Sequence, residues 1–133
     1  MGDAALGAFN GSQWSPDLDN AVNRRFVADF RAAYGRLPSI YASQAYDAAL
    51  ILDAAVAAAG SDWADKNKLR AALAAVKIDA ARGAFRFNTN HFPIQDYYVR
   101  EVYKNADGVI TNRMVEKIFE QHVDAYVGDC GMK

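Results

Sequence analysis

The sequence predicts an α/β fold in which helices fill the first half of the chain and antiparallel strands fill most of the second. Two patterns carry this prediction. Apolar residues recur at helical spacing between residues 19 and 76, and they alternate with polar residues at period two between residues 85 and 103. At 133 residues the chain has the size of one ordinary domain.

Composition restricts the classes of function. Hydrophobic residues make up 52% of the chain and charged residues 23%, which is typical of a globular protein. The formal net charge of −1 lacks the basic excess of a nucleic-acid-binding surface. No uncharged run has the length of a transmembrane helix. Residues 1–6 lack the basic and apolar regions of a secretory signal peptide.

The first elements follow from local signals. Residues 6–9 form a short apolar run that predicts a buried strand, and residues 10–12 supply a turn. A helix is predicted over residues 19–34 and ends at Gly35, a residue that suits the left-handed position after a helix. Its apolar stripe consists of Val22, Phe26, Phe30 and Tyr34.

Two more helices are predicted in succession. Residues 40–59 are apolar on nearly every face, which predicts burial on several sides. Residues 65–76 form a shorter helix with Leu69, Leu73 and Val76 inward.

The second half is read as a small antiparallel set followed by a helix. Residues 85–87 and 97–103 alternate, and residues 105–108 predict a hairpin turn. A final amphipathic helix is predicted over residues 114–127. The strand at residues 6–9 has no obvious neighbour, because a parallel partner would need its own crossover unit.

Signals for catalysis and metal binding are weak. His91 and His122 are the only histidines, and His122 and Asp124 lie two apart on the predicted final helix, where they do not face each other. The single cysteine, Cys130, is either a free thiol or an orphan whose partner lies upstream. Phosphate-binding glycine loops and a nucleophile elbow are missing from the sequence. We therefore expect a protein that is not an enzyme and needs no cofactor or metal.

Aromatic and amide side chains are the better lead. A ring near the end of an element can pack against an apolar solute while its polar atom orients the solute. Tyr41 suits binding and packing equally, whereas for Trp14 and Tyr46 packing is favoured. Asn10 and Gln44 carry amides that can donate and accept hydrogen bonds, although turn or capping roles are the simpler interpretation.

Several motifs occur in an order and spacing that is specific as a set. They are Tyr34-Gly35-x-x-Pro38-Ser39, Ala45-Tyr46-Asp47-Ala48, Gly83-Ala84-Phe85-x-Phe87, and the run from Asn88 to Asp96. Through them the chain resembles the C-terminal third of the type I periplasmic solute-binding proteins, which serve ABC importers of branched-chain amino acids and related carboxylates. The last motif, with residues 124–132, resembles a subgroup that imports aromatic acids or amino acids in metabolically versatile soil bacteria.

The resemblance implies two Rossmann-like lobes joined by three crossing segments, with the solute held in the cleft between the lobes. It makes residues 1–133 a single C-terminal fragment: a second-lobe strand (1–9), mostly first-lobe helices (10–87), and recrossing strands with the terminal helix (88–133). Tyr41 falls where family members place an aromatic residue against the ligand. Trp14, Asn10 and Gln44 flank the same cleft.

The resemblance also implies that the family's main amino- and carboxylate-binding loops lie upstream. We therefore expect that the chain alone does not bind solute tightly, and that its missing N-terminal segment or a second copy covers bare apolar faces of the helix at residues 40–59. The predicted function is the periplasmic solute-binding component of an ABC importer, which holds a branched-chain or aromatic amino acid, or an aromatic carboxylate, and docks to a permease. A ligand-sensing domain of the same fold and a free-standing oligomerising interaction module are the alternatives.

Overall fold

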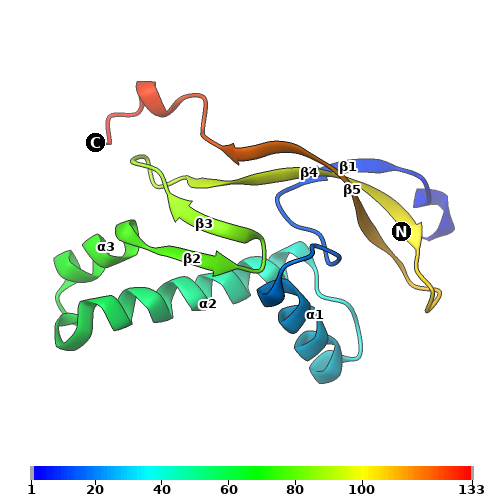
Figure 1. Cartoon of the computed structure of the whole chain (residues 1–133), viewed down its shortest axis with the longest axis horizontal. Helices are drawn as coiled ribbons and strands as arrows, with labels where there is room; N and C mark the ends of the chain where they lie inside the picture. Colours follow the sequence, from blue (N-terminus) through cyan, green and yellow to red (C-terminus); the bar gives the residue numbers. More distant parts are fainter. Residues whose placement is uncertain (1, 133) are drawn as a thin grey trace.

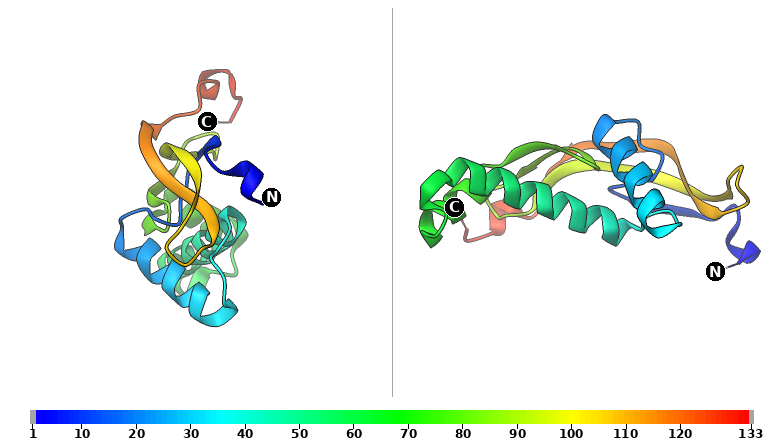
Figure 2. Two further views of the ribbon diagram at one scale, coloured as in Figure 1. Left: turned by 90° about the vertical axis from the view of Figure 1, so that its right-hand side faces the viewer. Right: turned by 90° about the horizontal axis from the view of Figure 1, so that it is seen from below.

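A computed structural model describes residues 2–132 and gives an elongated molecule, in which the helices lie along one side of the strands (Figures 1 and 2). The helices are α1 (Ala21–Tyr34), α2 (Ile40–Ala59) and α3 (Lys66–Ala75), with short 3-10 turns at Asp3–Ala5, Gly60–Asp62 and Val127–Asp129. The strands are β1 (Phe9–Ser12), β2 (Lys77–Ala80), β3 (Gly83–Phe87), β4 (Pro93–Lys104) and β5 (Ile110–His122).

The three predicted helices are confirmed: α1 begins two residues later than predicted, the bounds of α2 match, and α3 is one residue shorter at each end. Asn20 accepts a hydrogen bond from the Asn23 N–H, at 2.8 Å, and so caps the start of α1. Gly35 follows α1 with a φ of 66°, in the left-handed region that glycine adopts without steric cost. Asp65 caps α3 in the same way as Asn20 caps α1.

All strand pairs are antiparallel, in the order β1-β4-β3-β2. β1 and β5 both pair with residues 98–101 of β4, so they lie on opposite edges of that strand. The expectation that the first strand lacks a neighbour is wrong. It spans Phe9–Ser12 rather than residues 6–9, so the turn predicted at residues 10–12 is wrong as well. β4 pairs with it directly, so no crossover unit is needed.

The predicted final helix over residues 114–127 is also wrong, because most of this segment forms β5. The register between β4 and β5 shifts at three places, where β5 carries an extra residue. Two of these bulges fall between Met114 and Glu116 and between Lys117 and Phe119. Bulges at such short intervals break the period of two, so the apolar residues fall at three- and four-residue spacing and imitate a helix.

The core lies where α1, the start of α2 and the middle of the sheet meet. Its buried members are Trp14, Leu18, Phe26, Ala81 and Tyr98. The expectation that α2 is buried on several sides does not hold in this chain: its buried residues are Ser43, Asp47 and Ala55, whereas Leu52 and Val56 are 52% and 41% exposed. α2 therefore carries a bare apolar side.

Candidate ligand-binding site

The first turn of α2 presents two of the predicted ligand-binding residues to solvent. Ser39 caps the helix by accepting a hydrogen bond from the Ala42 N–H, and Ile40 packs against the core. Tyr41 is 77% exposed. Gln44 is exposed as well, and residues three apart on a helix are neighbours on its surface. The capped N-terminal end of α2 thus exposes the Tyr41 phenol and the Gln44 amide side by side to solvent.

Asn10 lies on β1, directly opposite Arg100 of β4. The Arg100 guanidinium donates to Asn10 Oδ1 from Nε at 2.9 Å and from Nη2 at 2.6 Å, and Asn10 Nδ2 donates to Asn112 Oδ1 at 2.7 Å. One N–H donor of Asn10 therefore has no partner among the described residues.

Arg100 connects this strand pair to the segment that leads into α1. Its Nη1 donates to the backbone oxygen of Trp14 at 2.8 Å. Burial lowers the pKa of the Arg100 guanidinium, while the negative charge of Asp17 raises it. Because an arginine titrates far above neutrality, the side chain remains a cation here.

Trp14 serves the core in this structure. It is 2% exposed, and its Nε1 donates to Asn23 Oδ1 at 2.7 Å. Its ring meets Phe26 edge to face, with centroids 6.2 Å apart. The packing interpretation is confirmed for Trp14, and also for Tyr46, whose ring centroid lies 4.7 Å from that of Phe26. Contact of Trp14 with a ligand stays a prediction.

The four predicted residues form two pairs. Asn10 and Trp14 are linked through Arg100, whereas Tyr41 and Gln44 share one side of α2. The first turn of α2 packs against the core cluster that contains Trp14, so the core joins the two pairs.

A buried polar network lies behind α2. Arg82, in the turn between β2 and β3, places Nε 2.7 Å from Oδ2 of Asp47, and Asp47 Oδ1 accepts from the Ala81 N–H at 2.7 Å. Arg82 Nη1 donates to Gln95 Oε1 at 3.0 Å, and Gln95 Nε2 donates to Tyr97 Oη at 3.1 Å. The network fixes α2 against β4. The sequence signal for it is Asp47, an acid inside a largely apolar helix.

A second charged pair joins β4 to β5, with Lys117 Nζ 2.7 Å from Asp96 Oδ2. Burial raises the pKa of the Asp96 carboxyl, but hydrogen bonds from Lys117 and from the Gln121 N–H outweigh it and hold that pKa below 3.8. The hydrogen bond between Lys117 and Asp96 also raises the pKa of Lys117. Burial, aided by the charge of Asp96, raises the pKa of Tyr98. Near neutral pH this hairpin therefore carries an intact ion pair beside a neutral phenol.

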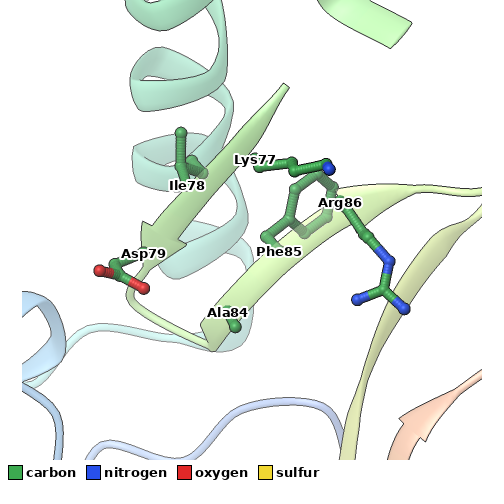
Figure 3. Close-up of a pocket in the computed structure, with 6 residues that line it drawn as sticks. All are labelled: Lys77, Ile78, Asp79, Ala84, Phe85 and Arg86. Carbon is green, nitrogen blue, oxygen red and sulfur yellow. The ribbon is translucent and has the colours of Figure 1, made fainter. Parts of the chain in front are cut away.

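Four hollows on the surface of the described residues are lined by none of the four predicted residues. A hollow of about 380 Å³ between α1 and α2 is lined by Tyr46 and its neighbours but not by Tyr41. Another, of about 320 Å³, follows the β2–β3 hairpin, where Lys77 and Arg86 extend from neighbouring strands (Figure 3).

Two negative findings apply to residues 2–132. No group of three or more histidine, cysteine, aspartate or glutamate side chains there is arranged to hold a metal ion. The same part of the chain contains no helix that combines the length and apolar character needed to cross a membrane.

Comparison with known proteins identifies the family. Residues 1–108 match the family described as periplasmic binding protein. A solute-binding protein of an ABC transporter from Rhodopseudomonas palustris, solved with benzoate, is 35% identical and superposes with a TM-score of 0.86 over 98% of this chain. A second, from strain BisB5 with 3,4-dihydroxybenzoic acid, is 30% identical, with a TM-score of 0.85 over 98% of this chain.

A leucine-binding protein from Thermotoga maritima shares the fold, with a TM-score of 0.73 and 24% identity over 88% of this chain. The chain spans only about a third of these structures: 34%, 35% and 32% of their respective lengths. No curated protein matches it. The family match, which covers four fifths of the sequence, establishes that this chain belongs to the type I periplasmic solute-binding proteins of ABC transporters.

Proposed function

We propose that this chain is part of the periplasmic solute-binding component of an ABC importer, and that the whole protein holds a branched-chain or aromatic amino acid, or an aromatic carboxylate, between two lobes. The exposed Tyr41 ring is the observation that carries this proposal. A tyrosine that stays 77% exposed, on a helix end whose neighbours are packed and capped, is free to cover an apolar solute. Gln44, beside it, would accept or donate a hydrogen bond to the polar end.

Asn10 and Trp14 take supporting places in this proposal. Asn10 would offer its remaining N–H donor from the β1–β4 crossing, and Trp14 would form the wall behind it. Arg100 holds both in position through its three hydrogen bonds. Closure of the lobes about the crossing strands would then trap the solute and present the closed form to a permease. The protein would perform no chemistry on the solute.

The division into lobes is part of the same proposal. Residues 1–9 would belong to the second lobe, residues 10–87 mostly to the first, and residues 88–133 would cross between them. The terminal segment of this division is the strand β5 in place of the predicted helix. The similar solved proteins are about three times as long, so a further N-terminal segment would supply the opposite wall and cover the bare side of α2.

A chimera tests the proposal. This chain would replace the matching third of the benzoate-binding Rhodopseudomonas palustris protein, and benzoate and leucine would be titrated calorimetrically. We expect saturable binding of at least one of the two, and a loss of tenfold or more in affinity for Tyr41→Ala. Trp63→Ala, which removes another exposed ring, serves as the control. A cooperatively folded chimera that binds neither solute, or that binds equally well without Tyr41, would contradict the proposal.

A further inference from the structure

A separate hollow of about 220 Å³ lies between α3 and the turn that joins β3 to β4. Figure 1 shows both of these elements toward the C-terminal end of α2. It is lined by Arg70, Leu73 and Ala74 from α3, by Phe87 from the end of β3, and by His91 from the turn. None of these residues is among the four predicted for the solute site. This hollow is therefore distinct from the solute site proposed above.

Arg70 supplies an uncommitted cation to this hollow. The chain has nine arginines. Among residues 2–132, every one except Arg70 takes part in an ion pair, a hydrogen bond or a contact with an aromatic ring. All five N–H donors of Arg70 are thus available, and a planar guanidinium binds a carboxylate through two parallel hydrogen bonds.

The opposite wall is a tight turn that holds an imidazole over the hollow. The Asn88 N–H donates to the Phe92 oxygen at 2.8 Å, and the His91 N–H donates to the Asn88 oxygen at 2.9 Å. His91 has a φ of 61°, in the left-handed region that side-chain-bearing residues seldom adopt. Residues kept in such a conformation are concentrated at ligand sites, where the surrounding structure sustains the strain.

The remaining walls are apolar. Leu73 and the Phe87 ring are half-buried, and Ala74 adds a methyl group. A space lined by hydrocarbon, with one guanidinium and one imidazole at its rim, matches an anion that has an apolar body. The volume is below the ~300–1,000 Å³ of sites for drug-sized ligands, so a small molecule fits best.

We propose that this hollow is a second, peripheral binding site for a small organic monocarboxylate, with its carboxylate on Arg70 and its apolar body against Leu73 and Phe87. Occupation of the site needs neither Tyr41 nor the opposite lobe. The proposal therefore stands or falls independently of the solute site, and the 133-residue chain itself is the material for the test.

Sodium benzoate is the probe, and benzyl alcohol, which has the same ring without the charge, is the matched comparison. Each is titrated into isotopically labelled protein while the methyl resonances of Leu73 and Ala74 are followed by NMR. We expect saturable shifts at these methyl groups with benzoate, and at least tenfold weaker binding of benzyl alcohol. Arg70→Gln should weaken benzoate binding by about 10- to 100-fold, since a hydrogen bond to a charged group contributes roughly 1.5–3 kcal/mol.

Lys66→Gln, which removes an exposed charge from the same helix outside the hollow, should leave the benzoate affinity unchanged. Phe87→Leu keeps the space filled while removing the ring, and should weaken binding severalfold. The proposal is overturned if benzoate leaves the Leu73 and Ala74 signals unmoved, if Arg70→Gln binds as well as the parent chain, or if benzyl alcohol binds as tightly as benzoate. Tyr41→Ala should behave as the parent chain does, which separates this site from the solute site.

Discussion

Asp47 and Arg82 form a buried ion pair that joins α2 to the β2–β3 turn, with Arg82 Nε 2.7 Å from Asp47 Oδ2. The Asp47 side chain is 0% exposed and the Arg82 side chain is 10% exposed. Each charge is further engaged, Asp47 by the Ala81 N–H and Arg82 by Gln95. A buried pair with this many hydrogen bonds tolerates replacement of both partners better than removal of one, because one partner alone leaves an uncompensated charge. The pair thereby sets the position of the helix that carries Tyr41.

Removal of one partner should be costly. We expect Arg82→Met to lower the free energy of unfolding by about 3–5 kcal/mol, because it strands the Asp47 carboxylate in the interior. Urea denaturation followed by circular dichroism measures the change. Arg24→Met is the matched control. It breaks the exposed pair with Asp19, which should cost about 1 kcal/mol or less. Equal losses of unfolding free energy in the two variants would show that the buried pair contributes no more to stability than the exposed pair.

The two tryptophans allow a second matched test. Trp14 is 2% exposed and Trp63 is 57% exposed. Trp14→Phe removes the donor to Asn23 and leaves that buried amide oxygen without a partner, so we expect a loss of about 1–3 kcal/mol in unfolding free energy in addition to the loss of packing. Trp63→Phe should be nearly neutral. The fluorescence of the Trp63→Phe variant should be that of a buried indole, and a solvent-exposed emission spectrum would contradict the assignment of Trp14 to the core.

The helices could be predicted from the sequence because their signals are local. Asn20, Ser39, Asp65 and Gly35 mark their ends within one turn, and the predicted bounds of α2 match the observed ones. The strands were harder. The partner of β1 is some ninety residues away, as in the Asn10–Arg100 pair, and no local pattern encodes such a pairing. β5 was misassigned because its bulges disturb the period of two.

Only the local part of the candidate site's geometry follows from the sequence, and the binding roles of its residues stay predictions. The exposure of Tyr41 agrees with an aromatic residue in the first turn of a helix. The engagement of Trp14 with Asn23, and of Asn10 with Arg100 and Asn112, depends on contacts between distant segments that composition and spacing do not contain.

The Asp96–Lys117 pair predicts an acid limit to stability. The pKa of Asp96 is below 3.8 in the folded chain, so its contribution is fully present above the unfolded pKa and is lost as the pH falls through the folded value. The raised pKa of Lys117 gives the converse at high pH: its contribution is present below 10.5 and is lost as the pH rises through the folded pKa. Melting temperatures measured between about pH 2 and pH 5 should fall toward the acid end.

Asp96→Asn should be less stable near neutral pH and should flatten that acid dependence. Asp29→Asn is the control, because it alters an exposed carboxylate 3.5 Å from Arg25. It should leave the acid dependence of the melting temperature unchanged. If the profiles of Asp96→Asn and the parent chain are parallel throughout this range, other carboxylates cause the acid dependence and the assignment to Asp96 is wrong.

The bare side of α2 predicts association of the chain with itself. Tyr41, Leu52 and Val56 are exposed, and residues 45, 48 and 49 between them are exposed alanines, so helical spacing gathers them into one uncharged stripe. We propose that an N-terminal segment covers this stripe in the whole protein. In its absence, the stripe of one chain can be buried against the stripe of a second copy. We expect the sedimentation coefficient to rise with concentration across the micromolar range. Leu52→Glu should suppress this rise, because association would then bury an unpaired charge. Ala58→Glu places the same charge at an exposed position of the same helix away from the stripe, and should leave the association intact. A parent chain that stays monomeric throughout this range would mean that α2 needs no cover, and the argument for a missing segment would then rest on length alone.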